Sequence, residues 1–233
     1  MDLLQNVRFL EQTSLFRGLS RDELKPFART AECRQAEHGK TFFEQGTPAD
    51  ALYILRHGRV KIVQTTHDGL RALLRFVGPR ELFGSAALLA DQTYEVSAAA
   101  VTWTQSLCWR RDIITRLMSK HPVTMQNALG ELSMRVRELR RRFQELATER
   151  VEQRVAQALV ELGEQAGWKT DGGLLIDIPL SRQDLAEMTG TTLYTVSRIL
   201  HGWHLRGLVQ AGRQRVSILS SDGLLAVANH ASA

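Results

Sequence analysis

The first half of the chain alternates short apolar runs with glycines. The runs occupy residues 41–43, 52–55, 60–63 and 73–77. Runs this short, with turn signals about every ten residues, are typical of strands in a small sandwich or barrel. His67-Asp68-Gly69 predicts a hairpin turn, because its glycine tolerates the positive φ that such a turn needs. Residues 3–32 predict short helices, one of them started by a capping box from Ser20 to Glu23.

The period changes at Pro122, a residue suited to a first helical turn. Apolar residues then recur at intervals of three and four, at Leu129, Leu132, Val136, Leu139, Phe143 and Leu146. This seam predicts a helix over residues 122–147, a rod of roughly 37 Å. The helix either packs only against its own domain or pairs with a second copy. We favour a dimer, because no other heptad helix in the chain could fill the seam.

A further helix is predicted over residues 149–165, with Thr148 as its cap. Residues 166–173 predict a turn-rich loop and residues 174–178 a short strand. Next, Ser181 and Asp184 resemble a capping box at the start of a short helix.

That short helix ends at Gly190, and a second helix begins at Thr192. The predicted buried stripe of the second helix is Val196, Ile199, Leu200 and Trp203. Two short helices joined by a glycine turn indicate a helix-turn-helix, with an ordinary helical hairpin as the alternative.

The second helix of this pair carries side chains suited to DNA. Short hydroxyl residues let a helix enter the major groove, and arginine can bond guanine through two parallel hydrogen bonds. After Gly207, two β-prone runs around Ala211-Gly212 predict a hairpin wing. The predicted DNA-binding residues are Arg182, Thr192, Tyr194, Thr195, Ser197, Arg198, His201, Arg213 and Arg215.

Composition limits the class of protein. The chain has 233 residues, 43% apolar and 24% charged, as in soluble globular proteins. No apolar run reaches the ~20 residues of a membrane span, and the N-terminus lacks a secretory pattern. Cys33 and Cys108 are too few for a disulfide framework or a four-cysteine iron–sulfur cluster. We therefore expect a cytoplasmic protein without membrane contact.

The charge of the chain indicates a binding partner, while its motifs argue against catalysis. The net charge is +5, and residues 179–217 hold five arginines against Asp184 and Glu187. This balance favours nucleic acid, with a solvated basic face as the plainer alternative. The sequence contains no phosphate loop, nucleophile elbow or metal-spaced cluster, so we predict neither an enzyme nor a metal site.

The glycine pattern from Gly39 through Gly58-Arg59-Val60 to Glu81-Leu82-Phe83-Gly84, with the winged helix-turn-helix, resembles the CRP/FNR superfamily of bacterial transcription regulators. The resemblance implies an α+β fold with a cyclic-nucleotide-binding-like β-roll over residues 1–121. A dimerisation helix over 122–147 and a DNA-binding domain over 148–233 would follow. It also implies a homodimer that binds an inverted DNA repeat, with half-sites about 34 Å apart, and that contacts RNA polymerase.

Three positions depart from the members that bind cyclic AMP. According to the resemblance, Ser85 stands at the position where those members bind the ribose with a glutamate. Glu95 stands where they bind the phosphate with an arginine, and Leu139-Arg140 stand where they contact the adenine. A carboxylate is the wrong charge for phosphate, so cyclic AMP is not the expected effector. The corresponding pocket would comprise Phe83, Gly84, Ser85, Tyr94, Glu95 and Ser97.

The family members that act in redox, nitric-oxide or nitrogen control remain as the members that this chain is expected to resemble. Several of them use haem or no known ligand. Candidate haem ligands are His38, His57, His67, His121, His201, His204 and His230, each of which also suits a surface or capping role. Cys33, beside Arg34, is a candidate reactive thiol. Tyr194 stands where many members have a glutamate that reads cytosine. We therefore expect a half-site that keeps the guanine read by Arg198 and differs nearby.

These observations predict a dimeric, effector-responsive transcription factor. The alternative is a ligand-binding signalling module whose C-terminal helices contact protein. Arg213 and Arg215 in the wing favour DNA, because a protein-contact surface would not need them beside an exposed Ser/Thr/Arg helix face. The effector, the target genes, and activation as against repression stay open.

Overall fold

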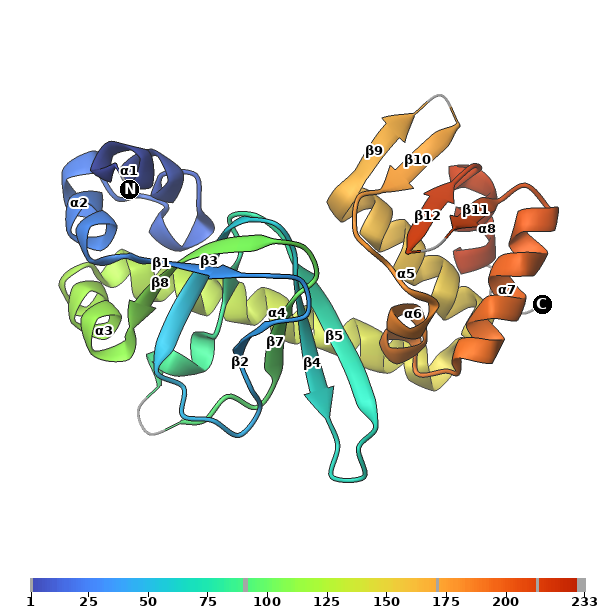
Figure 1. Ribbon diagram of the computed structural model, residues 1–233, viewed down its shortest axis with the longest axis horizontal. Helices are drawn as coiled ribbons and strands as arrows, with labels where there is room; N and C mark the ends of the chain where they lie inside the picture. The colour runs from blue at the N-terminus through green and yellow to red at the C-terminus, as the bar shows by residue number, and fades with distance from the viewer. Residues whose placement is uncertain (1, 90–91, 171, 213, 230–233) are drawn as a thin grey trace. The chain divides into compact units, whose positions relative to one another are not determined.

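A computed structural model describes residues 2–89, 92–170, 172–212 and 214–229 (Figure 1). The chain divides into two compact units. Unit 1 comprises residues 1–70 and 74–138, and unit 2 comprises residues 71–73 and 139–233.

Two four-stranded sheets form the centre of unit 1. The first has the order β1 (Glu32–Ala36), β8 (Thr104–Arg110), β3 (Ala51–His57), β6 (Leu82–Phe83). The second has the order β2 (Thr41–Phe43), β7 (Ser97–Ala100), β4 (Val60–Thr65), β5 (Arg71–Val77). The predicted strand runs are thus confirmed. The turn at residues 66–70 is closed by hydrogen bonds between Thr66 and Leu70.

Residues 51–55 of β3 are buried on both faces of the strand, which explains the unbroken apolar sequence of this part. Alternate residues point to opposite sides. Tyr53 and Leu55 enter the core between the sheets, whereas Leu52 and Ile54 enter a second core beneath the helices.

That second core is covered by short helices. They are α1 (Leu3–Leu10), η1 (Ser14–Phe16), α2 (Arg21–Thr30) and α3 (Arg111–Lys120). The predicted capping box is confirmed, because Ser20 and Glu23 exchange hydrogen bonds at the start of α2. The Trp109 indole donates to the Phe27 carbonyl at 2.8 Å, fastening the sheet to α2.

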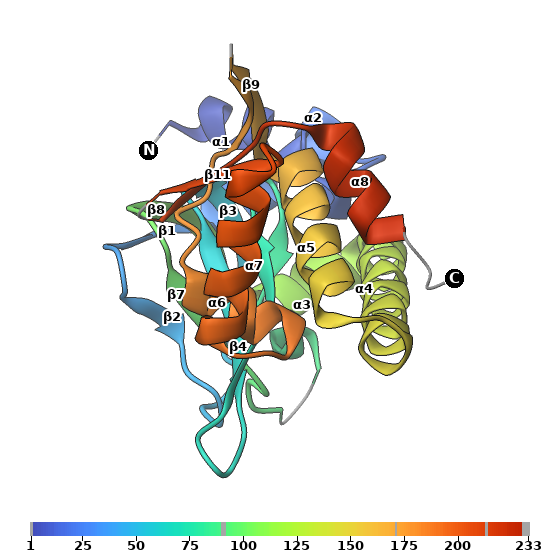
Figure 2. The same cartoon turned by 90° about the vertical axis from the view of Figure 1, so that its right-hand side faces the viewer.

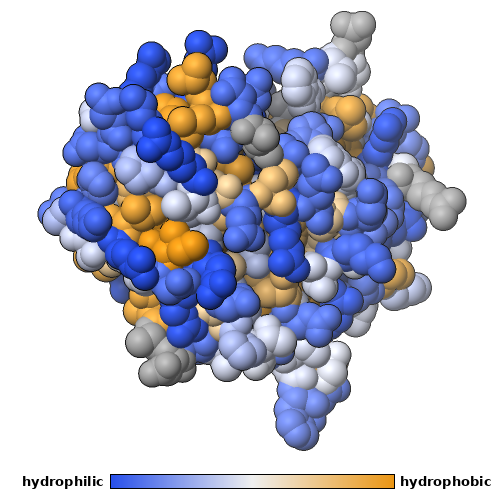
Figure 3. Space-filling view, turned by 60° about the vertical axis from the view of Figure 1, so that its left-hand side comes forward, coloured by the Kyte–Doolittle hydropathy of each residue, from blue (hydrophilic) through white to orange (hydrophobic). Residues whose placement is uncertain are grey.

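Helix α4 (Pro122–Thr148) begins at the predicted proline and contributes residues to both units. Its predicted seam is exposed to solvent along its whole length. The six seam residues are between 50% (Val136) and 74% (Phe143) exposed. Most of the surface visible in Figure 3 is hydrophilic, with apolar residues in separate patches. A continuous exposed apolar row on one helix is therefore unusual and points to a partner.

Besides the end of α4, the described residues of unit 2 form four helices and a small sheet (Figure 2). The helices are α5 (Val151–Ala166), α6 (Arg182–Thr189), α7 (Leu193–Leu205) and α8 (Ser221–Asn229). The sheet has the order β11 (Val209–Gly212), β12 (Arg215–Ile218), β10 (Gly173–Ile176), β9 (Gly167–Thr170). Strands β11 and β12 form the predicted wing hairpin.

Two local predictions in this unit are wrong. Thr148 is the last residue of α4 and bonds back to the Gln144 carbonyl, whereas Arg150 occupies the N-cap position of α5. The backbone N–H of Arg150 donates to the Gln153 side chain. The predicted loop 166–173 contains strand β9, because residues 167–170 pair with β10.

The predicted α+β fold class is confirmed, with a β-rich N-terminal part, a long helix and a winged helix-turn-helix. Among the described residues, the structure has no helix long and apolar enough to cross a membrane.

Candidate functional site

The turn between α6 and α7 is set by local chemistry. Ser181 caps α6, and its hydroxyl and backbone N–H both donate to the Asp184 carboxylate, at 2.5 and 3.0 Å. Gly190 ends the helix with φ +61°, a left-handed conformation that glycine adopts without penalty. Thr192 then caps α7 by accepting from the Thr195 backbone N–H at 3.2 Å.

Helix α7 has one buried and one exposed face. Val196, Leu200 and Trp203 are fully buried and hold the helix against unit 2. Ile199, predicted to belong to this stripe, is half-buried. On the other side Tyr194, Arg198 and His201 are exposed, and Tyr194 is 76% accessible. The helix lies at the edge of unit 2, at the far right in Figure 1.

Two predicted threonines and one serine are engaged within the unit. The hydroxyls of Thr192 and Thr195 lie 3.0 Å apart at the cap. Arg182, the first residue of α6, extends its guanidinium to the Ser197 hydroxyl at 3.5 Å. This contact places the Arg182 charge beside the first turns of α7.

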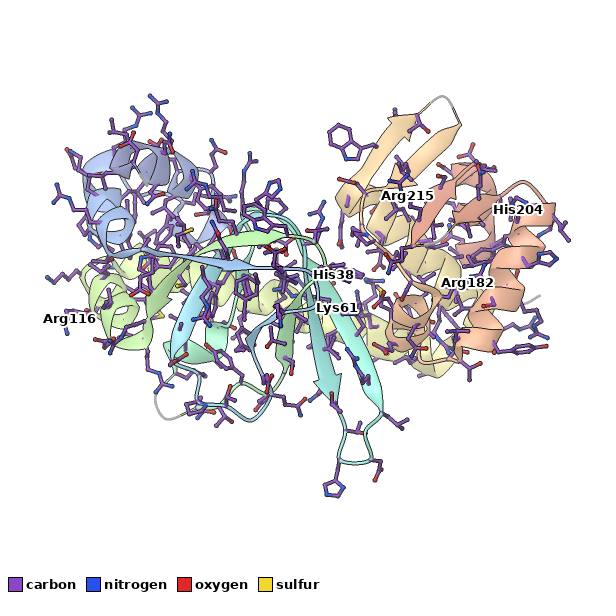
Figure 4. The ribbon with its side chains drawn as sticks, in the orientation of Figure 1. His38, Lys61, Arg116, Arg182, His204 and Arg215 are labelled. Atoms are coloured by element: carbon purple, nitrogen blue, oxygen red, sulfur yellow. The ribbon has the colours of Figure 1, made fainter. Side chains whose placement is uncertain are left out.

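The wing lies at the start of α6. The Leu180 backbone N–H donates to the Gln214 carbonyl at 3.2 Å, so the wing turn adjoins the residue before the Ser181 cap. Arg215 is exposed at the start of β12, and Figure 4 labels it together with Arg182 and His204. Arg213 lies outside the described residues.

Arg206 contributes less to this surface than its charge suggests. Its guanidinium pairs with the Glu152 carboxylate at 3.1 Å, and the same oxygen accepts from the Trp203 indole at 2.7 Å. The predicted arginines that the structure describes, Arg182, Arg198 and Arg215, belong to α6, α7 and the wing. The helix-turn-helix therefore presents a positive, partly hydroxylated surface, as a DNA-binding face requires.

The predicted effector residues range from buried to exposed. Phe83 and Tyr94 lie in the core between the sheets, where the Tyr94 ring stacks on Phe43 with centroids 3.7 Å apart. The Tyr94 hydroxyl donates to the Ala51 carbonyl at 2.6 Å and accepts from the Ala51 N–H at 3.1 Å. Burial raises the pKa of the Tyr94 hydroxyl. Tyr94 thus fastens its loop to β3.

Ser85 and Glu95 are exposed, and the Ser97 hydroxyl accepts from the Gln45 backbone N–H at 3.0 Å. Gly84 has φ +75°, and a Cβ there would lie 3.0 Å from the Ala51 carbonyl oxygen. The turn from β6 into η2 (Ser85–Leu88) consequently requires glycine. An open cleft of about 910 Å³ in unit 1 is lined by other residues, including Asp50, Leu89 and Arg110.

An ion network that the sequence did not indicate joins this region to α4. Arg75 donates to the Glu81 carboxylate at 2.7 Å and to the Leu82 carbonyl at 2.9 Å. Arg135 of α4 reaches the same Glu81 oxygen at 3.4 Å and Glu138 at 3.5 Å. Burial, and then the Arg135 charge, lower the pKa of Arg75 to about 10, so it stays charged at neutral pH.

The histidines have diverse surroundings. His38 Nδ1 lies 2.7 Å from the Val101 carbonyl, the His57 ring packs on Trp103, and His121 lies near Glu23 and Phe27. These contacts explain the positions of three candidate haem ligands, His38, His57 and His121, without a haem. His67 and the two α7 histidines are exposed, and His230 lies outside the described residues. The described part of the chain contains no group of three or more metal-ligating side chains.

Three exposed residues of α7, Leu193, His204 and Leu205, are absent from the predicted DNA-binding set. Leu193, the first residue of the helix, is 48% exposed. It lies outside the buried stripe formed by Val196, Leu200 and Trp203, and that position in the pattern could have identified it.

Known proteins resemble this chain over nearly its full length. The family model for the cyclic nucleotide-binding domain matches residues 33–121, and that for the Crp-like helix-turn-helix domain matches residues 153–227. The cyclic AMP receptor protein of Thermus thermophilus is 32% identical, over 90% of this chain and 94% of the relative. The global nitrogen regulator of Synechococcus elongatus is 27% identical, over 83% of this chain and 88% of the relative.

Solved structures are similar to this chain as well. A CRP-family transcriptional regulator from Thermus thermophilus matches with a TM-score of 0.73 and 25% identity, covering 85% of this chain and 97% of that one. The c-di-GMP-responsive global regulator of Xanthomonas campestris matches with a TM-score of 0.76 at 22% identity. It covers 86% of this chain and 100% of its own, and it supports the fold alone.

Proposed function

The chain belongs to the CRP/FNR family of transcription regulators, and from this premise we propose that it binds an inverted DNA repeat as a homodimer. At the level of the family it is a DNA-binding transcription regulator with an effector-binding domain and is not an enzyme. The observation that carries the proposal is the face of α7, with Tyr194, Arg198 and His201 exposed opposite a fully buried stripe.

Each predicted residue has a defined role on DNA. Arg198 bonds guanine through two parallel hydrogen bonds, and Tyr194 contacts a neighbouring base. Ser197, Thr195 and His201 complete the groove contacts. Arg182, Arg215 and Arg213 neutralise backbone phosphates, with Thr192 at the helix N-terminus supporting them.

Dimerisation through α4 supplies the second recognition helix. The exposed seam is apolar and regular, and pairing it with a second copy would bury it as in a coiled coil. RNA polymerase is the further protein partner that we propose for the DNA-bound dimer.

Regulation would pass from unit 1 to unit 2 along α4. Glu81 lies three residues before Gly84 and pairs with Arg135 of α4, so a ligand that moves the Gly84 turn would also move a contact of the helix. At the other end, Arg141 and Arg142 of α4 pair with Glu161 of α5. A shift of α4 would thereby change the spacing of the two recognition helices relative to the groove repeat.

The experiment is a binding selection from randomised duplex DNA, followed by affinity measurements on the selected site. We expect an inverted repeat with a guanine in each half-site. Arg198→Ala should cost about 1–3 kcal/mol, roughly a 5- to 150-fold loss, and should relax the preference at that guanine.

Arg116→Ala is the matched control, because Arg116 is an exposed arginine on α3 in unit 1 (Figure 4). It should leave affinity and preference unchanged. Selection of no common sequence, or equal losses in the two variants, would contradict the proposed function and favour a module that acts through protein contacts.

A further inference from the structure

Arg59, the residue before β4, is half-buried and packs on Gly78. Its Nη1 atom lies 2.5 Å from the position that a Cβ on this glycine would occupy. Among the described residues, Arg59 is the only partly buried arginine whose side chain makes neither a hydrogen bond nor an ion pair. The other partly buried arginines all have such partners, and they are Arg56, Arg75, Arg111, Arg135, Arg141, Arg142 and Arg154. A positive charge that is withdrawn from water without a partner is costly, so its position needs an explanation.

Arg80, two residues after Gly78, has a backbone conformation that suits glycine better. The Glu81 N–H donates to the Gly78 carbonyl at 3.1 Å, which closes a β-turn with Pro79 and Arg80 as its central residues. Arg80 has φ +72°, whereas a turn with proline second and a positive φ third ordinarily takes glycine at the third position. The Arg80 side chain is exposed, so packing does not explain the arginine. A strained residue that packing does not require indicates a function for its side chain.

The carboxylate beside this turn is already shared by other cations. Glu81 Oε1 lies 3.4 Å from the same Cβ position that Arg59 approaches. The other oxygen of Glu81 accepts from Arg75 at 2.7 Å and lies 3.4 Å from Arg135. Even with Glu138, which pairs with Arg135 at 3.5 Å, two glutamates stand against the four arginines of this group. This excess of positive charge indicates that the turn binds an anion.

A phosphate group suits Arg59 and Arg80 better than a carboxylate does. Each guanidinium offers parallel N–H donors, and the two oxygens of a carboxylate fill one such pair. A phosphate monoester has three terminal oxygens and a charge of about −1.5 to −2 at neutral pH, enough for two guanidiniums. We propose that Arg59 and Arg80 bind one phosphate group of a phosphorylated compound at the turn of residues 78–81. This site shares no residue with the predicted effector pocket and does not depend on the proposed function.

Thermal unfolding of the full chain tests the site with inorganic phosphate as the probe. Phosphate is titrated at pH 7.5, with potassium chloride adjusted to hold the ionic strength constant. The wild-type melting temperature should rise and saturate with a Kd of about 1 mM or below, as expected for two charge-assisted contacts. Arg59→Gln and Arg80→Gly should each raise that Kd at least about tenfold, since each removes one guanidinium. Phosphate also stabilises proteins as an excluded salt, but this part of the effect is common to all variants.

Arg80→Gly also separates binding from folding. It removes the steric cost of a positive φ, so in chloride alone it should unfold at the wild-type temperature or above. Gln214→Gly is the matched control, because Gln214 is the other described non-glycine residue with a positive φ, +56°, and lies in the wing. Arg198→Ala removes a cation that we propose to contact DNA. Both controls should keep the full response to phosphate.

The class of ligand is tested with two organic phosphates. Glycerol 3-phosphate, a monoester, should replace inorganic phosphate in the titration. Dimethyl phosphate, a diester with a single charge, should bind at least about tenfold more weakly. Equal affinities for the two compounds would overturn the assignment to a phosphate with two negative charges.

The variants decide whether the site exists. A phosphate response that persists unchanged in Arg59→Gln and Arg80→Gly would overturn it. A response that is lost only in Arg198→Ala would overturn it as well, because the phosphate would then bind on the DNA-binding face. A selection that yields no common DNA sequence would reject the proposed function but not the phosphate site, so the two failures are distinguishable.

Discussion

The two cysteines show how neighbouring positions in one sheet acquire different chemistry. Strands β1 and β8 pair so that Cys33 lies opposite Leu107 and Cys108 lies opposite Glu32. Opposed residues share a face, and adjacent residues alternate. Cys33 and Cys108 therefore project from opposite faces of the sheet, and a disulfide between them would require the strands to separate.

Reactivity follows from this placement. Cys33 is exposed, whereas Cys108 is buried, and burial raises the pKa of its thiol to about 11. Because the thiolate is the reactive species, a thiol reagent at pH 7.5 should modify one cysteine of the folded protein rapidly and the second only after denaturation. Mass spectrometry should locate the rapid modification at Cys33, and Cys33→Ser should abolish it. Rapid labelling of Cys108, or an intramolecular disulfide under mild oxidation, would show that this part of the sheet opens.

Residue-scale prediction from the sequence succeeded where the signal was local. Ser20, Ser181 and Gly190 were identified because caps and left-handed turns depend on residues a few positions apart. The Glu81–Arg135 pair spans 54 positions, and the Tyr94–Ala51 bonds span 43. Such partners are chosen by tertiary packing, which no local pattern encodes.

At the scale of elements, helix α4 was predicted within a residue at either end, because its period continues for many turns and begins at a proline. Strand β9 was missed, because Gly-Trp-Lys-Thr has no alternation and becomes a strand only by pairing with β10. A four-residue strand is thus determined by its neighbour rather than by its own sequence.

The seam of α4 allows a sharp test of dimerisation, since adjacent residues point to different sides. Phe143 is a seam residue, and Gln144 beside it is exposed away from the seam. Phe143→Glu removes two phenylalanines from a symmetric interface, about 1.5–3 kcal/mol each, and should weaken the dimer at least about 100-fold. Gln144→Glu introduces the same charge and should leave the dimer intact.

Sedimentation at micromolar concentration measures both variants. Gln144→Glu should unfold at nearly the wild-type temperature, and Phe143→Glu should lose only the stabilisation that association contributes. Phe143→Glu should also lose affinity for the inverted repeat while still binding a half-site weakly. A wild-type protein that sediments as single chains, with or without its DNA site, would contradict the dimer and the proposed function with it.

For the whole molecule, the question is which ligand couples unit 1 to DNA binding. A ligand changes the affinity of the protein for DNA only if it binds the DNA-competent conformation and the other conformation with different affinities. The size of the change is set by that difference. In the pocket that we expect from the family resemblance, cyclic AMP would place its phosphate near Glu95, an exposed carboxylate, and its ribose near Ser85. Tyr94 is fixed to Ala51 through both of its hydroxyl bonds, which anchors the backbone next to Glu95.

We therefore expect cyclic AMP at millimolar concentration to change the Kd for the selected DNA site by less than twofold. The cyclic AMP receptor protein of Thermus thermophilus, measured on its own site in the same assay, serves as the positive control. An absorption spectrum of protein purified without oxygen tests haem independently, because a bound haem gives a Soret band. A tenfold or larger tightening by cyclic AMP would mean that Ser85 and Glu95 do not define the effector pocket. The phosphate would then have to be held by cations from another element or from the partner subunit.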